Sequence, residues 1–341
     1  MIGYYVHHQG SGHLRRMTEI TRHLREPVTV LSSLPRPSGC GLPWVHLERD
    51  DLGPPGRDPQ AGGTLHWAPA YDAGLLARTL QVVAWVERHR PALVVVDVSV
   101  EVTLLVRLTG TPVLVVAMPG DRTDRPHRTA YDAADGLLAA WPREARIGGW
   151  PQSWTDKTSF VGAISRFDGR GRRPRPRREP FAPGRATLLW GTGGAAPPLA
   201  ELQALRHATP GWQWDVVGAG TVRDADEVWD ALGAAQVVVS HAGQNVVAEL
   251  AAARVPAVVV ADQRPFDEQR HMVGALGLMG VAVGLTSWPD PQRWPELLRA
   301  AQELGGERWR AWSTGDGARR AAQVIDGHVA RLAGTAEPAR T

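Results

Sequence analysis

The stretch 237–272 constrains the fold of this chain more than any other part of the sequence. It begins with a short β-branched run, passes through the small-residue turn 240–243, and then carries apolar residues at helical spacing over 244–254. Pro256 follows that helix and leads into a second apolar run, 257–261. Strand, turn, helix and buried strand in this order predict a βαβ unit of a parallel sheet.

The turn of this unit is suited to bind an anion, because the first turn of a helix leaves backbone N–H groups unpaired at the positive end of its dipole. His241 and Asn245 flank the turn, and Glu249 lies one helical turn further along the same face. A carboxylate placed there is able to accept from both hydroxyls of a ribose. The following loop supplies further groups of the kind that bind sugar hydroxyls, namely Asp267, Glu268 and Gln269.

Taken together, these residues resemble the donor-binding signature of nucleotide-sugar glycosyltransferases with the GT-B fold. That superfamily includes the UDP-glycosyltransferases, the antibiotic glycosyltransferases and the family 28 enzymes. The resemblance rests on His241-Ala-Gly-Gln-Asn245, Glu249, Val255-Pro256 and Asp267-Glu268-Gln269. It implies a donor site that contains His241, Gly243, Gln244, Asn245, Glu249, Asp267, Glu268 and Gln269. An ordinary βαβ unit whose polar residues cap a helix is the alternative.

The length of 341 residues exceeds one comfortable core and suits two domains. The resemblance implies an α/β architecture of two Rossmann-like, doubly wound parallel-sheet domains that face each other across a cleft. We expect the domains in this order: an acceptor domain at 1–164, an arginine- and proline-rich linker at 165–185, a donor domain at 186–315, and at 316–341 a helix that packs back on the first domain before a frayed tail.

The first predicted strand, 2–6, runs into the turn Gly10-Ser11-Gly12 and a helix that begins near His13. The two glycines let a ligand approach the backbone closely, as a phosphate or an acceptor would. Arg15 stands where a dinucleotide fingerprint has its third glycine, which disfavours a nicotinamide site. The loop resembles the Gly-His segment of GT-B glycosyltransferases and implies that His13 is the catalytic base, since a neutral imidazole accepts a hydroxyl proton near neutral pH. A helix-capping histidine is the alternative.

Asp97 ends the predicted buried strand 93–96, where ligands bind in open parallel sheets. Its carboxylate would accept the second ring N–H of His13 and stabilise the imidazolium. Many GT-B glycosyltransferases pair their histidine with such an aspartate. Glu101 is the rival partner, and a helix N-cap is the alternative role for Asp97. Further along, 132–140 is predicted to be a helix.

The second domain opens with strand 186–190 and the turn Gly191-Thr192-Gly193. Its backbone N–H groups and the Thr192 hydroxyl suit a phosphate, and the turn resembles the glycine loop at the diphosphate in family 28 enzymes. Asp224-Ala-Asp226 matches a metal-binding D-x-D pattern, but we interpret it as the acidic first turn of a helix. We therefore expect neither a metal nor a cofactor.

The composition limits which other classes of protein this chain can belong to. A hydrophobic share of 43% and a charged share of 21% are typical of globular proteins. The single cysteine, the lack of a secretory signal and the lack of a long apolar run predict a cytoplasmic protein. Arginines and prolines alternate over 166–185, which favours an extended linker and leaves weak peripheral contact with a membrane open. The sequence shows no pattern typical of nucleic-acid binding.

The sequence thus predicts a metal-independent, inverting glycosyltransferase of the hexosyltransferase type. Its partners would be a nucleotide-sugar donor, with UDP favoured, and a small-molecule or lipid-linked acceptor. Two alternatives stay open: a nucleotide-sugar 2-epimerase or hydrolase of the same fold, and a catalytically silent sugar-nucleotide-binding partner protein.

Overall fold

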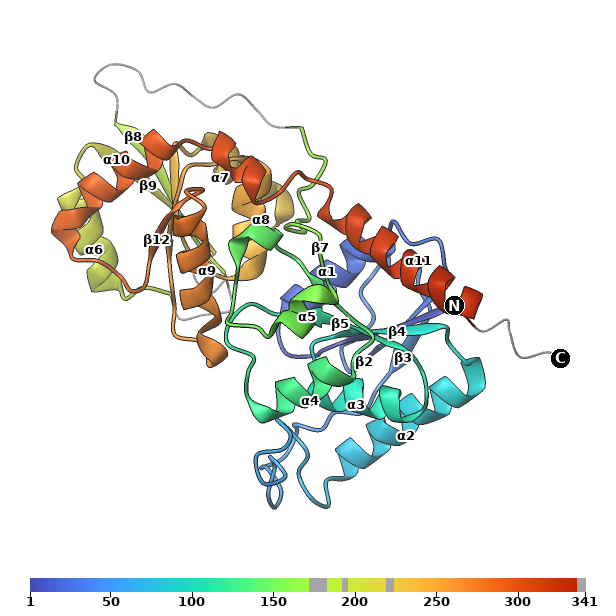
Figure 1. The fold of residues 1–341 in the computed structure, drawn as a ribbon. Helices are drawn as coiled ribbons and strands as arrows, with labels where there is room; N and C mark the ends of the chain where they lie inside the picture. Colours follow the sequence, from blue (N-terminus) through green and yellow to red (C-terminus); the bar gives the residue numbers. More distant parts are fainter. Residues whose placement is uncertain (172–182, 192–195, 219–223, 336–341) are drawn as a thin grey trace.

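The computed structural model describes residues 1–171, 183–191, 196–218 and 224–335. Within these ranges the chain forms two α/β units, each built on a parallel sheet (Figure 1). The strands of the first sheet are β1 (Ile2–Val6), β2 (Val28–Ser32), β3 (Trp44–His46), β4 (Leu93–Asp97), β5 (Val113–Ala117), β6 (Gly136–Ala139) and β7 (Thr158–Phe160). Those of the second sheet are β8 (Gly184–Trp190), β9 (Trp212–Gly218), β10 (Val237–His241), β11 (Ala257–Val260) and β12 (Val283–Leu285).

Helices connect the strands and cover the sheets. The helices of the first unit are α1 (Ser11–Thr21), α2 (Ala73–His89), α3 (Val100–Leu108), α4 (Arg125–Ala133) and α5 (Gln152–Asp156). The second unit contributes α6 (Leu199–Ala208), α7 (Ala225–Ala234), α8 (Gln244–Ala253), the short 3-10 helix η2 (Pro265–Asp267), α9 (Glu268–Leu278) and α10 (Trp294–Leu304). The last helix, α11 (Gly317–Thr335), returns to the first unit (Figure 1).

Each sheet has one point at which the strand order reverses. The first sheet runs β3-β2-β1-β4-β5-β6-β7, and the second runs β12-β11-β10-β8-β9. The order therefore reverses between β1 and β4 in one unit and between β8 and β10 in the other. The loops after these four strands diverge to opposite faces and leave a crevice, which is where open α/β sheets bind ligands.

Apolar side chains on both faces of the central strands form the core. All five residues of β1, of β4 and of β5 are buried, as expected for parallel strands covered on both sides. One cluster on the first sheet includes Ile2 and Ile20, and α11 completes it with Ala321, Ile325 and Val329. The terminal helix thus fills a face of the first sheet that its own helices leave open.

Most predicted strands and helices are present within one or two residues of the predicted bounds. The predicted helix at 132–140 is wrong, since α4 ends at Ala133 and the following Gly136–Ala139 is strand β6. A short apolar run fits a buried strand and a helix equally well, and pairing with β5 decides in favour of the strand. The prediction for Asp224 and Asp226 is confirmed, because the Asp224 carboxylate caps α7 by accepting from the Asp226 N–H.

The two units touch through backbone and side chains near the cleft. The N–H of Asp121, after β5, donates to the carbonyl of Phe266 in η2 at 2.8 Å. The guanidinium of Arg122 stacks over the Phe266 ring at 4.4 Å. Gly120 permits this approach, because a Cβ at that position would lie 2.5 Å from the Phe266 carbonyl oxygen.

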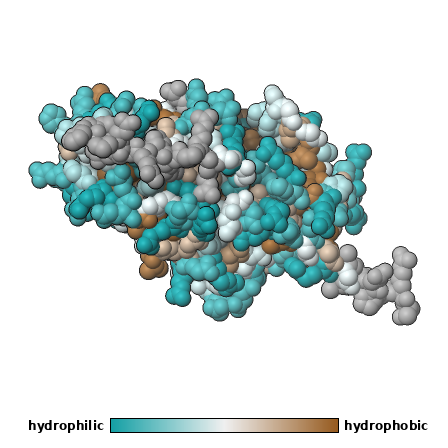
Figure 2. All heavy atoms as spheres, turned by 90° about the horizontal axis from the view of Figure 1, so that it is seen from above, coloured by the Kyte–Doolittle hydropathy of each residue, from teal (hydrophilic) through white to brown (hydrophobic). Residues whose placement is uncertain are grey.

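Figure 2 shows a face of the molecule on which hydrophilic residues predominate and apolar areas are small. Among the helices of the described ranges, none combines the length and the apolar character that crossing a bilayer requires. The arginine-rich linker falls partly outside those ranges, at 172–182, so its predicted membrane contact stays a prediction.

Candidate active site between the two domains

A cleft of about 610 Å³ lies between the two units, at the point where both strand orders reverse. The first unit lines it with Gly10, Gly12, His13, Arg15, Arg16 and Arg166, among others. The second unit lines it with Gly191, His241, Gly243, Gln244, Asn245, Glu249, Glu268 and Gln269, among others. The structure therefore brings the predicted base and most of the predicted donor residues together in one space.

His13 lies in the first turn of α1, and its Nδ1 is 2.9 Å from Oδ1 of Asp97 at the end of β4. With Nδ1–H donating to the carboxylate, Nε2 retains its lone pair. His13 does not cap α1, whose N-cap is Gly10, and Asp97 does not cap α3, whose N-cap is Ser99. The rival Glu101 is engaged elsewhere, because its Oε1 accepts from the backbone N–H groups of 66 and 67.

Arg16 is the central residue that sequence reasoning missed. Its Nε donates to Oδ2 of Asp97 at 3.0 Å and its Nη2 to Oδ1 at 2.6 Å. Burial alone would raise the pKa of Asp97, but the charges and hydrogen bonds of Arg16 and His13 more than offset burial and hold this pKa below its usual range. The carboxylate is therefore ionised. An arginine three residues after His13 on one helix face was the available signal.

The second unit reaches this group through Gln244 at the start of α8. Its Oε1 accepts from Nη1 of Arg16 at 2.8 Å. Next to it, Asn245 packs so closely against Gly12 that a Cβ on the glycine would lie 2.2 Å from the Asn245 Nδ2. The N-termini of α1 and α8 therefore face each other across the cleft, and both present unpaired N–H groups to it.

His241 ends β10, and its ring lies beside Gly191, the residue after β8. Its Nδ1 accepts from the N–H of Gly243 at 3.0 Å, so the neutral ring carries its proton on Nε2. Burial lowers the pKa of His241 to about 4, and the ring is neutral at pH 7. Nε2 is buried with no partner in the described part of the chain, and it lies 3.1 Å from the position of a Cβ on Gly191. This N–H is a preset donor for an anion at that turn. Thr192 and Gly193 lie outside the described residues.

Glu249 is buried, with 4% of its surface exposed, and its Oε1 faces two arginines. Nε of Arg166 is 2.8 Å away and Nη1 of Arg15 is 3.7 Å away. Burial raises the pKa of Glu249, although both arginines oppose that shift. One carboxylate oxygen is thus engaged by protein, and the predicted ribose contact falls to the other oxygen.

The predicted loop 267–269 is the N-terminus of α9, with Asp267 as the N-cap, and its three residues have different roles. Gln269 is buried, and its Oε1 accepts from the N–H groups of Ala242 at 3.1 Å and Asp262 at 2.9 Å. These bonds hold together the segments that follow β10 and β11. Glu268 accepts from Nη2 of Arg122 at 3.1 Å across the domain junction. Asp267 is exposed and is absent from the cleft lining, so the structure does not group it with the other donor residues.

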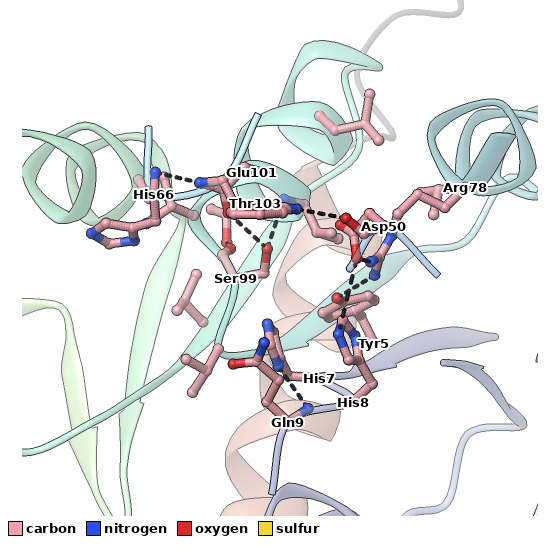
Figure 3. A pocket seen from close by; sticks show the side chains of 18 of the residues that line it. Tyr5, His7, His8, Gln9, Asp50, His66, Arg78, Ser99, Glu101 and Thr103 are labelled. Carbon is pink, nitrogen blue, oxygen red and sulfur yellow. Dashed lines mark hydrogen bonds and ion pairs between the residues drawn. The ribbon is translucent and has the colours of Figure 1, made fainter. Parts of the chain in front are cut away.

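A second cavity, of about 380 Å³, lies within the first unit (Figure 3). Gln9 lines both this cavity and the cleft, so the two adjoin there. Figure 3 shows His7, His8 and Gln9 on one side, with Ser99, Glu101 and Thr103 facing them from the start of α3. The sequence did not identify this cavity, because its walls come from seven separate segments.

His7 lies where this cavity approaches His13. Its Nδ1 accepts from the Gln9 N–H at 3.1 Å, so Nε2 carries the proton of the neutral ring. Burial, with the neighbouring histidines, lowers the pKa of His7 to about 3. The ring centroids of His7 and His13 are 6.1 Å apart. A molecule in the cavity therefore meets a neutral N–H donor beside the base.

Comparisons with known proteins agree with this geometry. Residues 221–276 match the model of the glycosyltransferase family 28 C-terminal domain. No curated protein sequence matches the chain.

Among solved structures, MurG of Acinetobacter baumannii is 15% identical with a TM-score of 0.63, covering 96% of this chain and 99% of that one. The kitacinnamycin glycotransferase is 18% identical with a TM-score of 0.65 and coverages of 96% and 98%. The calicheamicin glycosyltransferase CalG4 is 17% identical with a TM-score of 0.62 and coverages of 97% and 99%. The fold is GT-B, as predicted. The family 28 match covers the segment that contains α8, whose first residues line the cleft.

Proposed function

We propose that this chain, a glycosyltransferase of GT-B fold with a family 28-like C-terminal segment, moves a sugar from a nucleoside diphosphate to a small-molecule hydroxyl, with inversion. The observation that carries this proposal is that His13, paired with Asp97, lines the same cleft as the start of α8, to which Arg16 links Asp97. The proposed base and the proposed anion site both line this cleft. UDP is the donor nucleotide that the resemblance favours.

In the proposed reaction, Nε2 of His13 takes the proton of the acceptor hydroxyl while Asp97 stabilises the resulting imidazolium. The acceptor oxygen forms a bond to the anomeric carbon, and the bond from that carbon to the β-phosphate oxygen breaks on the opposite face. The departing diphosphate gains negative charge. The N–H groups at the start of α8 and the Nε2–H of His241 are placed to stabilise that charge without a metal.

The cavity of the first unit favours a small acceptor over a lipid-linked one. Its volume of about 380 Å³ lies in the usual range for enclosed small-molecule sites. Three acidic side chains, Asp50, Asp51 and Glu101, line it against one arginine, Arg78. Asp50 pairs with Arg78 and Asp51 with Arg49, so the described lining of the cavity leaves no arginine unpaired for an acceptor diphosphate. We therefore propose a compact, uncharged or cationic hydroxyl compound.

The first experiment identifies the donor. Thermal unfolding of the purified chain is followed with UDP, dTDP and GDP, and a ligand at 100 times its dissociation constant stabilises by about 2.7 kcal/mol. We expect UDP to give the largest shift and Glu249→Gln to reduce that shift. Equal, negligible shifts with all three nucleotides would contradict the donor site.

The second experiment tests the base. With a mixture of small hydroxylated acceptors and the UDP-sugar that stabilises best, His13→Ala should lower transfer by about 100-fold or more at unchanged UDP affinity. The control is His23→Ala, an exposed histidine just beyond α1. Donor consumption without any acceptor product would indicate the epimerase or hydrolase instead. Nucleotide binding with no turnover at all, in wild type as in His13→Ala, would indicate the silent binding protein.

A further inference from the structure

We propose that His66, Asp124 and His127 form a binding site for a single Zn²⁺ ion at the wall of the acceptor cavity. The ligand atoms of these three residues all lie within 4.8 Å of one another. They come from the loop after β3, from the residue before α4 and from α4 itself. The proposal concerns a site apart from the diphosphate and does not depend on the transfer reaction.

The geometry of the three side chains is that of a ligand set before an ion enters. Nε2 of His66 is 2.8 Å from Oδ2 of Asp124, and the other carboxylate oxygen faces Nδ1 of His127. The two imidazole rings have their centroids 4.4 Å apart at 60° to each other. Two nitrogens bound to one tetrahedral Zn²⁺ are about 3.3 Å apart, since each Zn–N bond is about 2.0 Å. The ligand atoms now lie within 4.8 Å of one another, and a rotation of the partly exposed His66 side chain would bring its nitrogen to this separation.

The side chain of Asp124 has an unusual role for an aspartate at the start of a helix. It is the N-cap residue of α4, yet its side chain caps no backbone N–H. An aspartate at this position ordinarily accepts from the first turn of its helix. Asp72 does so for α2 and Asp224 does so for α7 in this same chain. At α4 both carboxylate oxygens turn to the imidazoles instead, which leaves the helix start without a side-chain cap and builds the three-ligand group.

The chemistry of the three groups limits the choice of ion. Two imidazoles and one carboxylate suit a first-row transition-metal ion such as Zn²⁺, whereas Mg²⁺ and Ca²⁺ prefer oxygen ligands alone. The charge of Arg122 opposes a cation nearby, but Glu268 pairs with that guanidinium at 3.1 Å and offsets it.

The position of the group gives the ion an open side. His66 and His127 both line the 380 Å³ cavity. Three protein ligands leave the fourth tetrahedral position for water or for an oxygen of the bound molecule. On the other side Phe266 of the donor unit packs against both rings, with centroids 5.5 Å from His66 and 4.8 Å from His127. An ion here would tie the cavity wall to the domain junction.

A second group of similar composition serves as the internal comparison. His8, Asp50 and Asp51 also place their ligand atoms within 4.8 Å of one another. Both carboxylates are already paired with cations, Asp50 with Arg78 and Asp51 with Arg49. An ion there would have to displace two arginines, so we assign the site to the group around Asp124.

The test uses the full chain after treatment with a chelator. Equilibrium dialysis against Zn²⁺, and the visible absorption of Co²⁺ as a substitute, should show one ion per chain with nitrogen and oxygen ligands. The double variant His66→Gln/His127→Gln should bind at least about 100-fold more weakly, and Asp124→Asn about 10- to 100-fold more weakly. His8→Gln should bind as the wild type does.

Three outcomes would overturn the proposal: no stoichiometric Zn²⁺ in the wild type, undiminished binding in the double variant, or loss of binding in His8→Gln. Circular dichroism and thermal unfolding without metal check that each variant folds. If the buried His127 variant does not fold, His66→Gln alone decides, because that side chain is 32% exposed and its loss leaves no buried gap.

Discussion

The guanidinium of Arg16 holds both carboxylate oxygens of Asp97, with Nη2 2.6 Å from Oδ1 and Nε 3.0 Å from Oδ2. Asp97 is fully buried and Arg16 is 5% exposed, so neither charge has water to replace its partner. The pair therefore fixes the aspartate that orients His13. Arg16 also connects this pair to the second unit, because it donates a hydrogen bond to Gln244.

Arg16→Met should destabilise the fold by about 3–5 kcal/mol, because it leaves a buried carboxylate without its cation. Urea unfolding at pH 7 measures this loss. The matched control is Arg22→Met, whose partner Glu19 lies in an exposed i,i+3 pair and whose loss should cost about 0.5 kcal/mol or less. Adding Asp97→Asn to Arg16→Met should recover part of the stability. Equal losses at Arg16 and Arg22 would contradict the importance of the buried pair.

Gly12→Ala should weaken UDP binding about tenfold, which corresponds to about 1.4 kcal/mol. Its Cβ would lie 2.2 Å from Nδ2 of Asn245, so that side chain must leave the start of α8. Calorimetric titration with UDP measures the effect. Gly233→Ala, inside α7 with no atom within 4 Å of the new Cβ, should leave UDP affinity unchanged and stabilise by about 0.5–1 kcal/mol. Wild-type affinity in Gly12→Ala would show that Asn245 does not help to bind the donor.

His241→Asn should flatten the dependence of stability on pH. Burial lowers the pKa of His241 from 6.5 to about 4 in the folded chain. Between these pH values the unfolded chain binds one proton that the folded chain does not, so the free energy of unfolding falls as the pH is lowered. Removing the imidazole should reduce this slope by about 1.4 kcal/mol per pH unit near pH 5. Urea unfolding at several pH values decides, and parallel curves for the two proteins would refute the neutral buried state.

Gly120→Ala should separate the two units near the cleft. Gly120 has a φ of 104°, and a Cβ there would lie 2.5 Å from the Phe266 carbonyl oxygen and 2.9 Å from the Cα of Glu268. Backbone atoms on both sides cannot yield without breaking the contact from Asp121 to Phe266. We expect a larger radius of gyration by small-angle X-ray scattering and a stability loss of about 1–3 kcal/mol. Gly149→Ala, which meets no atom within 4 Å, is the control and should scatter as the wild type does.

The local sequence pattern predicted those strands and helices whose apolar residues follow a regular pattern. The apolar runs at β1, β4 and β10 are recognisable in the sequence because buried parallel strands are continuously apolar, and glycine turns mark the ends of β1 and β10. The helix predicted at 132–140 was wrong because four apolar residues after Gly136 carry no period of their own. Helix α9 was not predicted, because its first turn is made of polar residues, Glu268, Gln269 and Arg270, which were interpreted as part of a loop.

By itself, the sequence predicted the two-sheet α/β plan and the strand–turn–helix unit that ends in α8, since these depend on short segments whose hydrophobic period and turn chemistry are local. The resemblance to GT-B glycosyltransferases added His13 and Asp97 as the proposed base and its partner. The tertiary structure alone decided which of those segments adjoin. Arg16 meets Gln244 across 228 positions, and His66 meets Asp124 across 58. Such contacts depend on strand order and on how two domains pack, and neither leaves a trace in the local spacing of residues.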